Sequence, residues 1–99
     1  MTPDFIFDHR LGISVPSAVP SIKDHSAAMA QWEKERSKIP DRIAELEDVI
    51  RAKQRRMDHE ENFEAACLYN AAIADLASVI NDLWLWYRAF DPFGEKTHQ

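Results

Sequence analysis

The residues of this 99-residue chain that could bind a metal ion or act as a nucleophile are four histidines and one cysteine: His9, His25, His59, His98 and Cys67. Two ligands share one face of a helix when they lie three or four residues apart, and none of these five residues has another of them at that distance. Cys67 also has no neighbouring histidine in the sequence to act as its base. The sequence therefore predicts no metal site, no cofactor site and no catalytic residue, and we expect a protein that is not an enzyme.

A short basic segment offers a second kind of chemistry, contact with phosphate groups. Arg51, Arg55 and Arg56 lie in it together with Lys53, and two copies in a dimer would form a basic patch. The four side chains point to several sides of a helix, however, and the whole chain has a net charge of −5, which gives no general attraction to a polyanion. Nucleic-acid binding through these arginines is therefore an alternative and not the leading hypothesis.

The composition is that of a single domain in a reducing compartment. The chain falls within the usual size range of one domain, and its single cysteine cannot form an internal disulfide. The first residues lack the basic start and the long apolar run of a secretion signal. The longest apolar candidate for a membrane span, around residues 83–90, is short and contains Arg88. We therefore expect a cytoplasmic protein that does not cross a membrane.

Residues 1–24 are predicted to form an extended arm instead of a helix. They contain one of the two glycines and three of the five prolines, and proline interrupts helical hydrogen bonding. The segment is nonetheless rich in large apolar residues, and residues 11–15 alternate in polarity with the two-residue period of a strand. We expect this arm to pack along another apolar surface.

Three helices are expected after the arm, in a helical domain of residues 25–94 that is followed by a polar tail of residues 95–99. The helices are predicted at about residues 26–38, 40–58 and 63–90. The apolar residues of the first two follow a heptad pattern that continues through Pro40, a residue that fits the first turn of a new helix. The polar segment before the last helix ends in Asn62, a good capping residue, and predicts a tight turn.

The last of these helices has the clearest apolar pattern in the chain. Seven residues recur at spacings of three and four: Ala66, Tyr69, Ile73, Leu76, Ile80, Leu83 and Tyr87. A second apolar stripe beside them widens the apolar arc to about half of the helix circumference, which is more than one partner helix covers. When this helix folds back on residues 40–58, its last ten residues or so extend beyond its partner, and many of them are aromatic.

This aromatic end must be covered, and the sequence leaves three options open: the first helix, the apolar arm or a second chain. The candidate surface for a partner protein or for self-association consists of Phe5, Phe7, Trp32, Leu83, Trp84, Trp86, Tyr87 and Phe90. A chain of this size in an elongated helical form gains stability from self-association. We therefore expect a homo-oligomer, with a dimer favoured.

The stretch from Asn62 to Ile73 resembles the second helix of the UVR motif, a short helical hairpin found in nucleotide-excision repair subunits and in some protease regulators. The residues that match its pattern Phe-Glu-x-Ala-Ala-x-Leu-Arg-Asp-x-Ile are Phe63, Glu64, Ala66 and Ile73. The departures are Cys67 for the second alanine, Tyr69 for the leucine, and Asn70 with Ala71 for the Arg-Asp pair. The resemblance, which covers residues 45–76, implies a helical hairpin used for contact with another protein.

Taken together, the sequence predicts an all-α fold: an antiparallel, coiled-coil-like helical hairpin with a short preceding helix and an extended N-terminal arm. The expected function is that of a non-enzymatic protein–protein interaction module. Such a module acts as an adaptor or inhibitor on a larger protein complex, through its helical or arm surfaces. The alternatives are a nucleic-acid-binding helical dimer and a structural subunit of a larger assembly.

Overall fold

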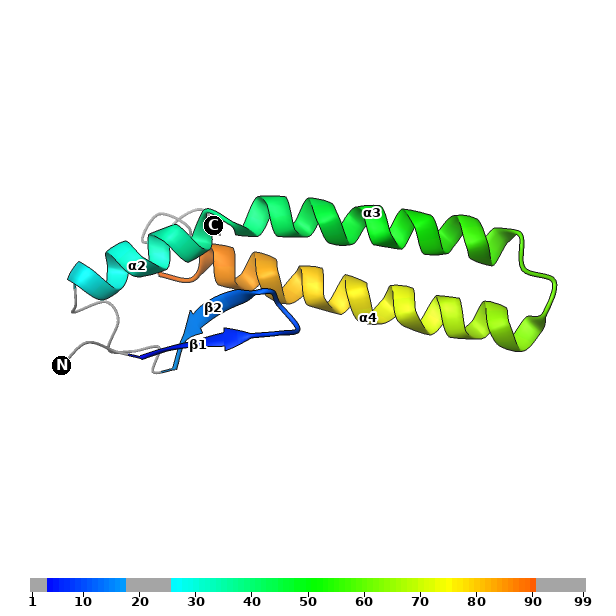
Figure 1. Ribbon diagram of the computed structural model, residues 1–99, viewed down its shortest axis with the longest axis horizontal. Coiled ribbons are helices and arrows are strands. Elements are labelled where there is room, and N and C mark those ends of the chain that lie inside the picture. Colours follow the sequence, from blue (N-terminus) through cyan, green and yellow to red (C-terminus); the bar gives the residue numbers. More distant parts are fainter. Residues whose placement is uncertain (1–3, 18–25, 91–99) are drawn as a thin grey trace, which may run out of the picture.

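The computed structural model describes residues 4–17 and 26–90. Its elements follow in the order β1 (Phe5–Asp8), β2 (Ile13–Pro16), α2 (Ser26–Arg36), α3 (Ile39–Asp58) and α4 (Phe63–Arg88). The described chain is mostly helical, as predicted, although α2 and α4 each end two residues earlier than expected (Figure 1). The parts of the predicted arm at residues 1–3 and 18–24, and the tail at residues 95–99, lie outside the described residues.

The departure from the predicted all-α fold is a small two-stranded sheet. β1 pairs antiparallel with β2, with Asp8 opposite Ile13. In the turn between them, the Asp8 carboxylate accepts hydrogen bonds from the backbone N–H groups of Arg10 and Leu11, at 2.9 and 3.0 Å. Gly12 follows with a φ of 81°, which glycine adopts without steric cost. The described part of the predicted extended arm therefore folds back on itself as a β-hairpin.

Two short connections set the order of the helices. Pro40 lies in the first turn of α3, where its missing N–H removes no intrahelical hydrogen bond. Before α4, the side chain of Asn62 accepts a hydrogen bond from the backbone N–H of Ala65 at 3.0 Å and caps the helix. The chain reverses between Asp58 and Phe63, so that α4 runs back beside α3 (Figure 1).

The core lies at the end of the molecule where the β-hairpin and α2 meet the two long helices (Figure 1). Its buried residues are Leu11, Ile13, Ala28, Trp32, Ile39, Ile43, Leu46, Val79 and Leu83. No residue from 47 to 78 is fully buried. Within residues 4–17 and 26–90, the molecule therefore has a core end of several packed elements and a distal half in which only α3 and α4 lie against each other.

This arrangement is elongated and exposes an unusually large surface. The radius of gyration is 17.1 Å, against about 13 Å for a compact domain of this length. The solvent-accessible surface is 7013 Å², whereas a compact monomer of this mass exposes about 5,800 Å². The two-helix thickness of the distal half contributes to this excess of about 1,200 Å², because it leaves both helices open to solvent.

Candidate protein-interaction surface

The aromatic end of α4 is covered in part from within the chain. Trp32 of α2 is fully buried, and its ring centroid lies 5.6 Å from that of Trp86 and 6.1 Å from that of Phe90. Leu83, one turn before Trp86, is also fully buried. The first helix is therefore one cover of the aromatic end, among the three that the sequence left open.

Arg36 holds the end of α4 against α2. Its guanidinium carbon lies 4.2 Å from the centre of the Tyr87 ring, and its Nε donates a hydrogen bond to the Tyr87 carbonyl at 2.7 Å. The last carbonyls of a helix have no intrahelical donor and carry the negative end of the helix dipole, so a guanidinium there stabilises the terminus. α4 ends at this point, since Ala89 is extended and Phe90 has a φ of 65°. Phe90 therefore lies just outside the helix that the sequence predicted to include it.

The turn of the β-hairpin, which we call the tip, rests on both long helices. From one side of it, the guanidinium of Arg10 pairs with the carboxylate of Asp82 on α4 at 2.7 Å. On the other side, Nε of Arg42 on α3 donates to the Leu11 carbonyl at 3.0 Å. A Cβ at Gly12 would lie only 2.6 Å from the same Nε, so the close approach of the tip to α3 requires glycine.

Glu35 links α2 to the second strand. Its two carboxylate oxygens accept hydrogen bonds from the backbone N–H of Ser14 at 2.8 Å and from Nζ of Lys38 at 2.7 Å. Burial of the carboxyl raises its pKa, but the hydrogen bonds from Lys38 and Ser14 and the charge of Lys38 outweigh burial and leave the pKa lowered. Glu35 is therefore held in its ionised form near neutral pH, where it fixes the hairpin on α2.

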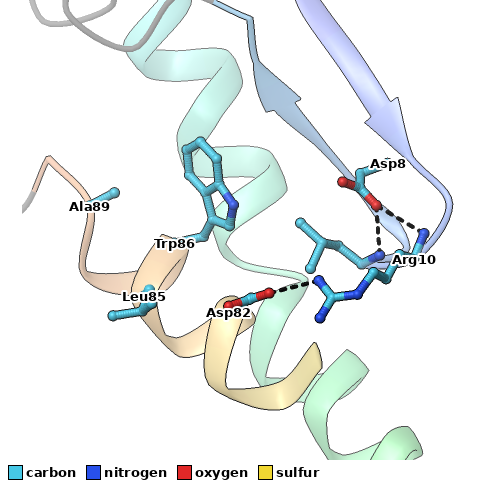
Figure 2. Close-up of a pocket in the computed structure, with 7 residues that line it drawn as sticks. Asp8, Arg10, Asp82, Leu85, Trp86 and Ala89 are labelled. Carbon is cyan, nitrogen blue, oxygen red and sulfur yellow. Dashed lines mark hydrogen bonds and ion pairs between the residues drawn. The ribbon is translucent and has the colours of Figure 1, made fainter. Parts of the chain in front are cut away.

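The tip and the end of α4 enclose a groove of about 420 Å³, which we call the tip groove. Its walls are formed by Asp8, Arg10, Leu11, Asp82, Leu85, Trp86 and Ala89. In Figure 2, the Arg10–Asp82 ion pair connects the hairpin to α4, and Leu85, Trp86 and Ala89 follow along the helical side. Leu85 is 58% exposed. The groove therefore combines an open apolar wall with a charged rim.

The sequence-predicted surface residues are distributed between the core and the exterior. Trp32 and Leu83 are fully buried within the chain. Four others are half-buried, namely Phe5, Trp86, Tyr87 and Phe90, and two are exposed, namely Phe7 and Trp84. Among these eight residues, only Trp86 lines the tip groove. The structure therefore does not bring them together as a single open surface.

The other walls of the tip groove were not identified by sequence reasoning. Leu85 lies outside both apolar stripes of its helix. An apolar residue on the side of the helix that is otherwise exposed was the one sign in the sequence that Leu85 could belong to a binding surface. Arg10 and Asp82 are 72 residues apart in the sequence, and no local pattern indicates that they pair.

The candidate metal and nucleophile residues are dispersed. Among residues 4–17 and 26–90, no group of three or more His, Cys, Asp or Glu side chains could hold a metal ion. The ring of His9 lies 4.9 Å from that of Phe7, and Nδ1 of His59 lies 2.8 Å from the Arg55 carbonyl oxygen. Cys67 is exposed. His25 and His98 lie outside the described residues.

The three arginines considered for phosphate contact lie in the second half of α3. Arg51 pairs with Asp48 one turn earlier, while Arg55 and Arg56 are exposed. Together with Ala52 and His59, the latter two line a shallow depression. Adjacent helical residues point about 100° apart, so Arg55 and Arg56 do not face one phosphate group in parallel. Binding of nucleic acid here stays a prediction.

Much of the apolar surface of α4 is left uncovered in the described structure. By length and composition alone, α4 is apolar enough to cross a membrane, although a single helix of this kind indicates little by itself. Its most apolar 18-residue window has a mean hydropathy of 1.4, and only 6% of that window is buried. The exposed large apolar side chains of the described chain are Ile6, Phe7, Val49, Phe63, Leu68, Trp84 and Leu85.

Comparison of the chain with protein-family models gave no match. Comparisons with curated proteins and with solved structures gave no match either. The resemblance of residues 45–76 to the UVR motif therefore stays a prediction from the sequence.

Proposed function

We propose that this chain is a non-enzymatic protein–protein interaction module, an adaptor or inhibitor, and that it binds a segment of a partner protein in the tip groove. The observation that carries the proposal is the open apolar wall of the groove, where Leu85 is 58% exposed beside half-buried Trp86. Exposed apolar side chains gathered next to fixed polar groups are typical of protein-binding surfaces.

The lining of the tip groove indicates the chemistry of the bound segment. Its walls carry two carboxylates, Asp8 and Asp82, against the single guanidinium of Arg10. The local charge is therefore about −1, and the net charge of the whole chain is −5. Opposite charges across an interface favour association and register. The partner segment accordingly offers an apolar side chain to Leu85 and Trp86, with a basic residue beside it.

A protein fits this surface better than a lipid bilayer does. α4 carries Asp75 and Asp82 in its central and C-terminal parts, and a charged side chain at the centre of a bilayer costs about 2.5–3.5 kcal/mol or more. Asp82 also pairs with Arg10 of the tip, so insertion of α4 would require this ion pair to separate or to enter the bilayer as well.

Site-specific photo-cross-linking in the native cell tests this function. A photoreactive amino acid is placed at position 85 and, as a matched control, at position 71. Ala71 is exposed on the same side of α4, two heptads from the groove. The expected result is a discrete adduct from position 85 to a protein other than this chain, which is absent from position 71 and is lost when Trp86→Asp is added. Adducts to lipid alone, no adduct to another protein, or equal adducts to another protein at the two positions would contradict the proposal.

A further inference from the structure

The tip marks one side of the α3–α4 hairpin, and the same side continues uncovered into the distal half. The tip contacts Arg42 on α3 and Asp82 on α4. Residues seven apart lie on nearly the same side of a helix, with a drift of about 20°. Steps of seven residues from Arg42 lead to Val49 and Arg56, and two such steps from Asp82 lead back to Leu68. These residues, together with Glu45, Ala52, Ala72 and Asp75, form what we call the distal face.

The apolar residues of the distal face have no cover in the described structure. Val49 is 42% exposed and Leu68 is 73% exposed, whereas Val79, which lies on the same side of α4 at the core end, is buried. The side that the tip covers at the core end is thus open along the distal half, although its apolar character continues there.

The α3 part of the distal face has a symmetric pattern of side chains. Glu45, Val49, Ala52 and Arg56 follow one another at spacings of four, three and four residues, so they form a single stripe along the helix. Read from either end, the stripe is a charge, an apolar residue, an apolar residue and the opposite charge. An antiparallel copy of the same stripe therefore places acid opposite base and apolar opposite apolar.

We propose that the distal face binds a second copy of this chain, with the two α3 helices antiparallel about a two-fold axis midway between Val49 and Ala52. Glu45 of each copy then pairs with Arg56 of the second copy, and Val49 packs against the small side chain of Ala52. Among the described residues, neither Glu45 nor Arg56 has an ion-pair partner within its own chain; the four ion pairs there join other residues. Both charges are therefore available to the second copy.

The length of the uncovered stripe matches this axis. Arg42, which the tip contacts, lies seven residues before Val49. His59, the first residue of the turn between α3 and α4, lies seven residues after Ala52. An antiparallel copy on this axis consequently places its own turn level with Arg42, beside Leu11 of the tip. The tips of the two copies limit how far the copies overlap, and the pairing of acid with base and of apolar with apolar favours this register over a slipped one.

α4 supports the same pairing. Because α3 and α4 run antiparallel from one turn, residues at equal distances from that turn lie level with each other. Ala72 lies nine residues after the start of α4, and Val49 lies nine residues before the end of α3. Ala72 is therefore level with Val49 and close to the axis. The half-buried Ala72 permits close approach there. Asp75 lies further along α4 at the level of Glu45, where the second copy brings its Arg56. The one carboxylate that α4 contributes to the distal face thus lies at the level of a positive charge of the second copy.

The distal half leaves a two-helix surface open for a second copy. No residue from 47 to 78 is fully buried, and each partner of a standard protein interface buries about 800 Å². Pairing through the distal face would bring four helices together where the single chain has two, which covers the apolar arc that one partner helix leaves open.

Charge reversal in the full-length chain tests the pairing, with sedimentation equilibrium as the measurement. Glu45→Arg sets Arg against Arg at both symmetry-related contacts, and Arg56→Glu sets Glu against Glu. Each single variant is expected to weaken the dimer about tenfold, since two attractive contacts become repulsive and tenfold corresponds to about 1.4 kcal/mol. Residues 45 and 56 are three turns apart, so the double variant E45R/R56E changes no contact between them within one chain and is expected to dimerise like the natural chain.

A mixture of the two single variants provides the sharpest outcome. Chains with E45R and chains with R56E each associate weakly alone, but together they form heterodimers in which both contacts are Arg with Glu. The matched control is Glu47→Arg, because Glu47 lies on the other side of α3, and it is expected to leave the dimer constant unchanged. Circular dichroism checks that each variant keeps its helix content.

Several results would overturn the proposal. A chain that sediments as a monomer at up to about 100 µM, well above the Kd of ordinary specific complexes, has no such dimer. A dimer that is insensitive to both single reversals, or one that neither the double variant nor the mixture restores, uses a different surface. Adducts from position 85 to another protein differ in mass from adducts to a second copy of this chain, so the proposed function and the self-association fail or succeed separately.

Discussion

Trp32 provides a direct test of how the core end is assembled. Its side chain is fully buried among Trp86, Phe90 and the other core residues, yet its indole Nε1 has no hydrogen-bond acceptor among the described residues. We compare Trp32→Ala, which removes the ring, with Trp32→Phe, which keeps an aromatic ring and removes the unpaired donor.

The two substitutions differ in their expected cost because Trp32→Ala removes the packing of the ring, whereas Trp32→Phe keeps a ring and removes the unpaired donor. Replacing a buried aromatic residue by alanine costs about 3–5 kcal/mol, and loss of two aromatic pairs contributes about 0.5–1.5 kcal/mol each to that total. A buried donor without a partner costs about 1–3 kcal/mol, which Trp32→Phe recovers. This gain offsets much of the lost packing, so we expect a net cost below about 2 kcal/mol for Trp32→Phe.

Urea unfolding followed by circular dichroism at 222 nm measures both free energies of unfolding. The helical signal is used because the substitution itself changes tryptophan fluorescence. All samples are compared at one low protein concentration, since self-association would add a concentration-dependent term to the stability. Trp32→Ala is expected to lower the urea midpoint strongly and Trp32→Phe only slightly.

Equal destabilisation by the two substitutions would refute this reasoning. That outcome would mean that the indole N–H contributes as much as the ring does, and hence that it is hydrogen-bonded in the folded protein. A variant Trp32→Phe that is more stable than the natural chain would instead show that desolvation of the N–H outweighs the packing of the larger ring.

Three other features of the core end give measurable expectations. Gly12→Ala places a Cβ 2.6 Å from Nε of Arg42 at a φ of 81°, so we expect a loss of at least about 1–2 kcal/mol, and an unchanged urea midpoint would contradict the close approach. Glu35→Gln tests the lowered pKa: the carboxylate stabilises the folded state fully above its unfolded pKa of about 4.3, and this contribution is lost as the pH falls through the lower folded pKa. The stability difference between the natural chain and Glu35→Gln should accordingly shrink between pH 6 and pH 3, and a constant difference would be inconsistent with ionisation as its source. Arg36→Lys keeps the charge but loses the planar group that both stacks on Tyr87 and donates to its carbonyl; we expect faster hydrogen exchange in the last turn of α4, and unchanged exchange would argue against this cap.

The positions of the helices could be predicted because their signals are local. The three- and four-residue spacing of apolar side chains marks α3 and α4, Asn62 caps α4 through a residue three positions away, and Pro40 fits only an early helical turn. Each signal acts over a few residues, so the sequence states it directly. The end of α4 was placed two residues late because the apolar pattern continues to Phe90, whereas the cap comes from Arg36 on another helix.

The β-hairpin and the tip groove could not be predicted because distant residues create them. The contacts that hold the hairpin join Ser14 to Glu35, Leu11 to Arg42 and Arg10 to Asp82. The residues that make these three polar contacts do not recur at a regular spacing in the sequence, so no periodic pattern indicates them. The local signs were present, with an aspartate before the turn and Gly12 within it, but they also fit an extended arm.

The ion pair between Arg10 and Asp82 also has a consequence for the order of folding. This contact joins residues 72 positions apart, whereas α3 and α4 meet through a turn of four residues. The entropy of loop closure makes distant contacts slower to form. The α3–α4 hairpin is therefore expected to form early, and the β-hairpin to dock late on a surface already in place. Docking of the tip is then the step that completes the tip groove, so a chain emerging from synthesis acquires this groove, the binding surface that we propose, only after α4 has been made.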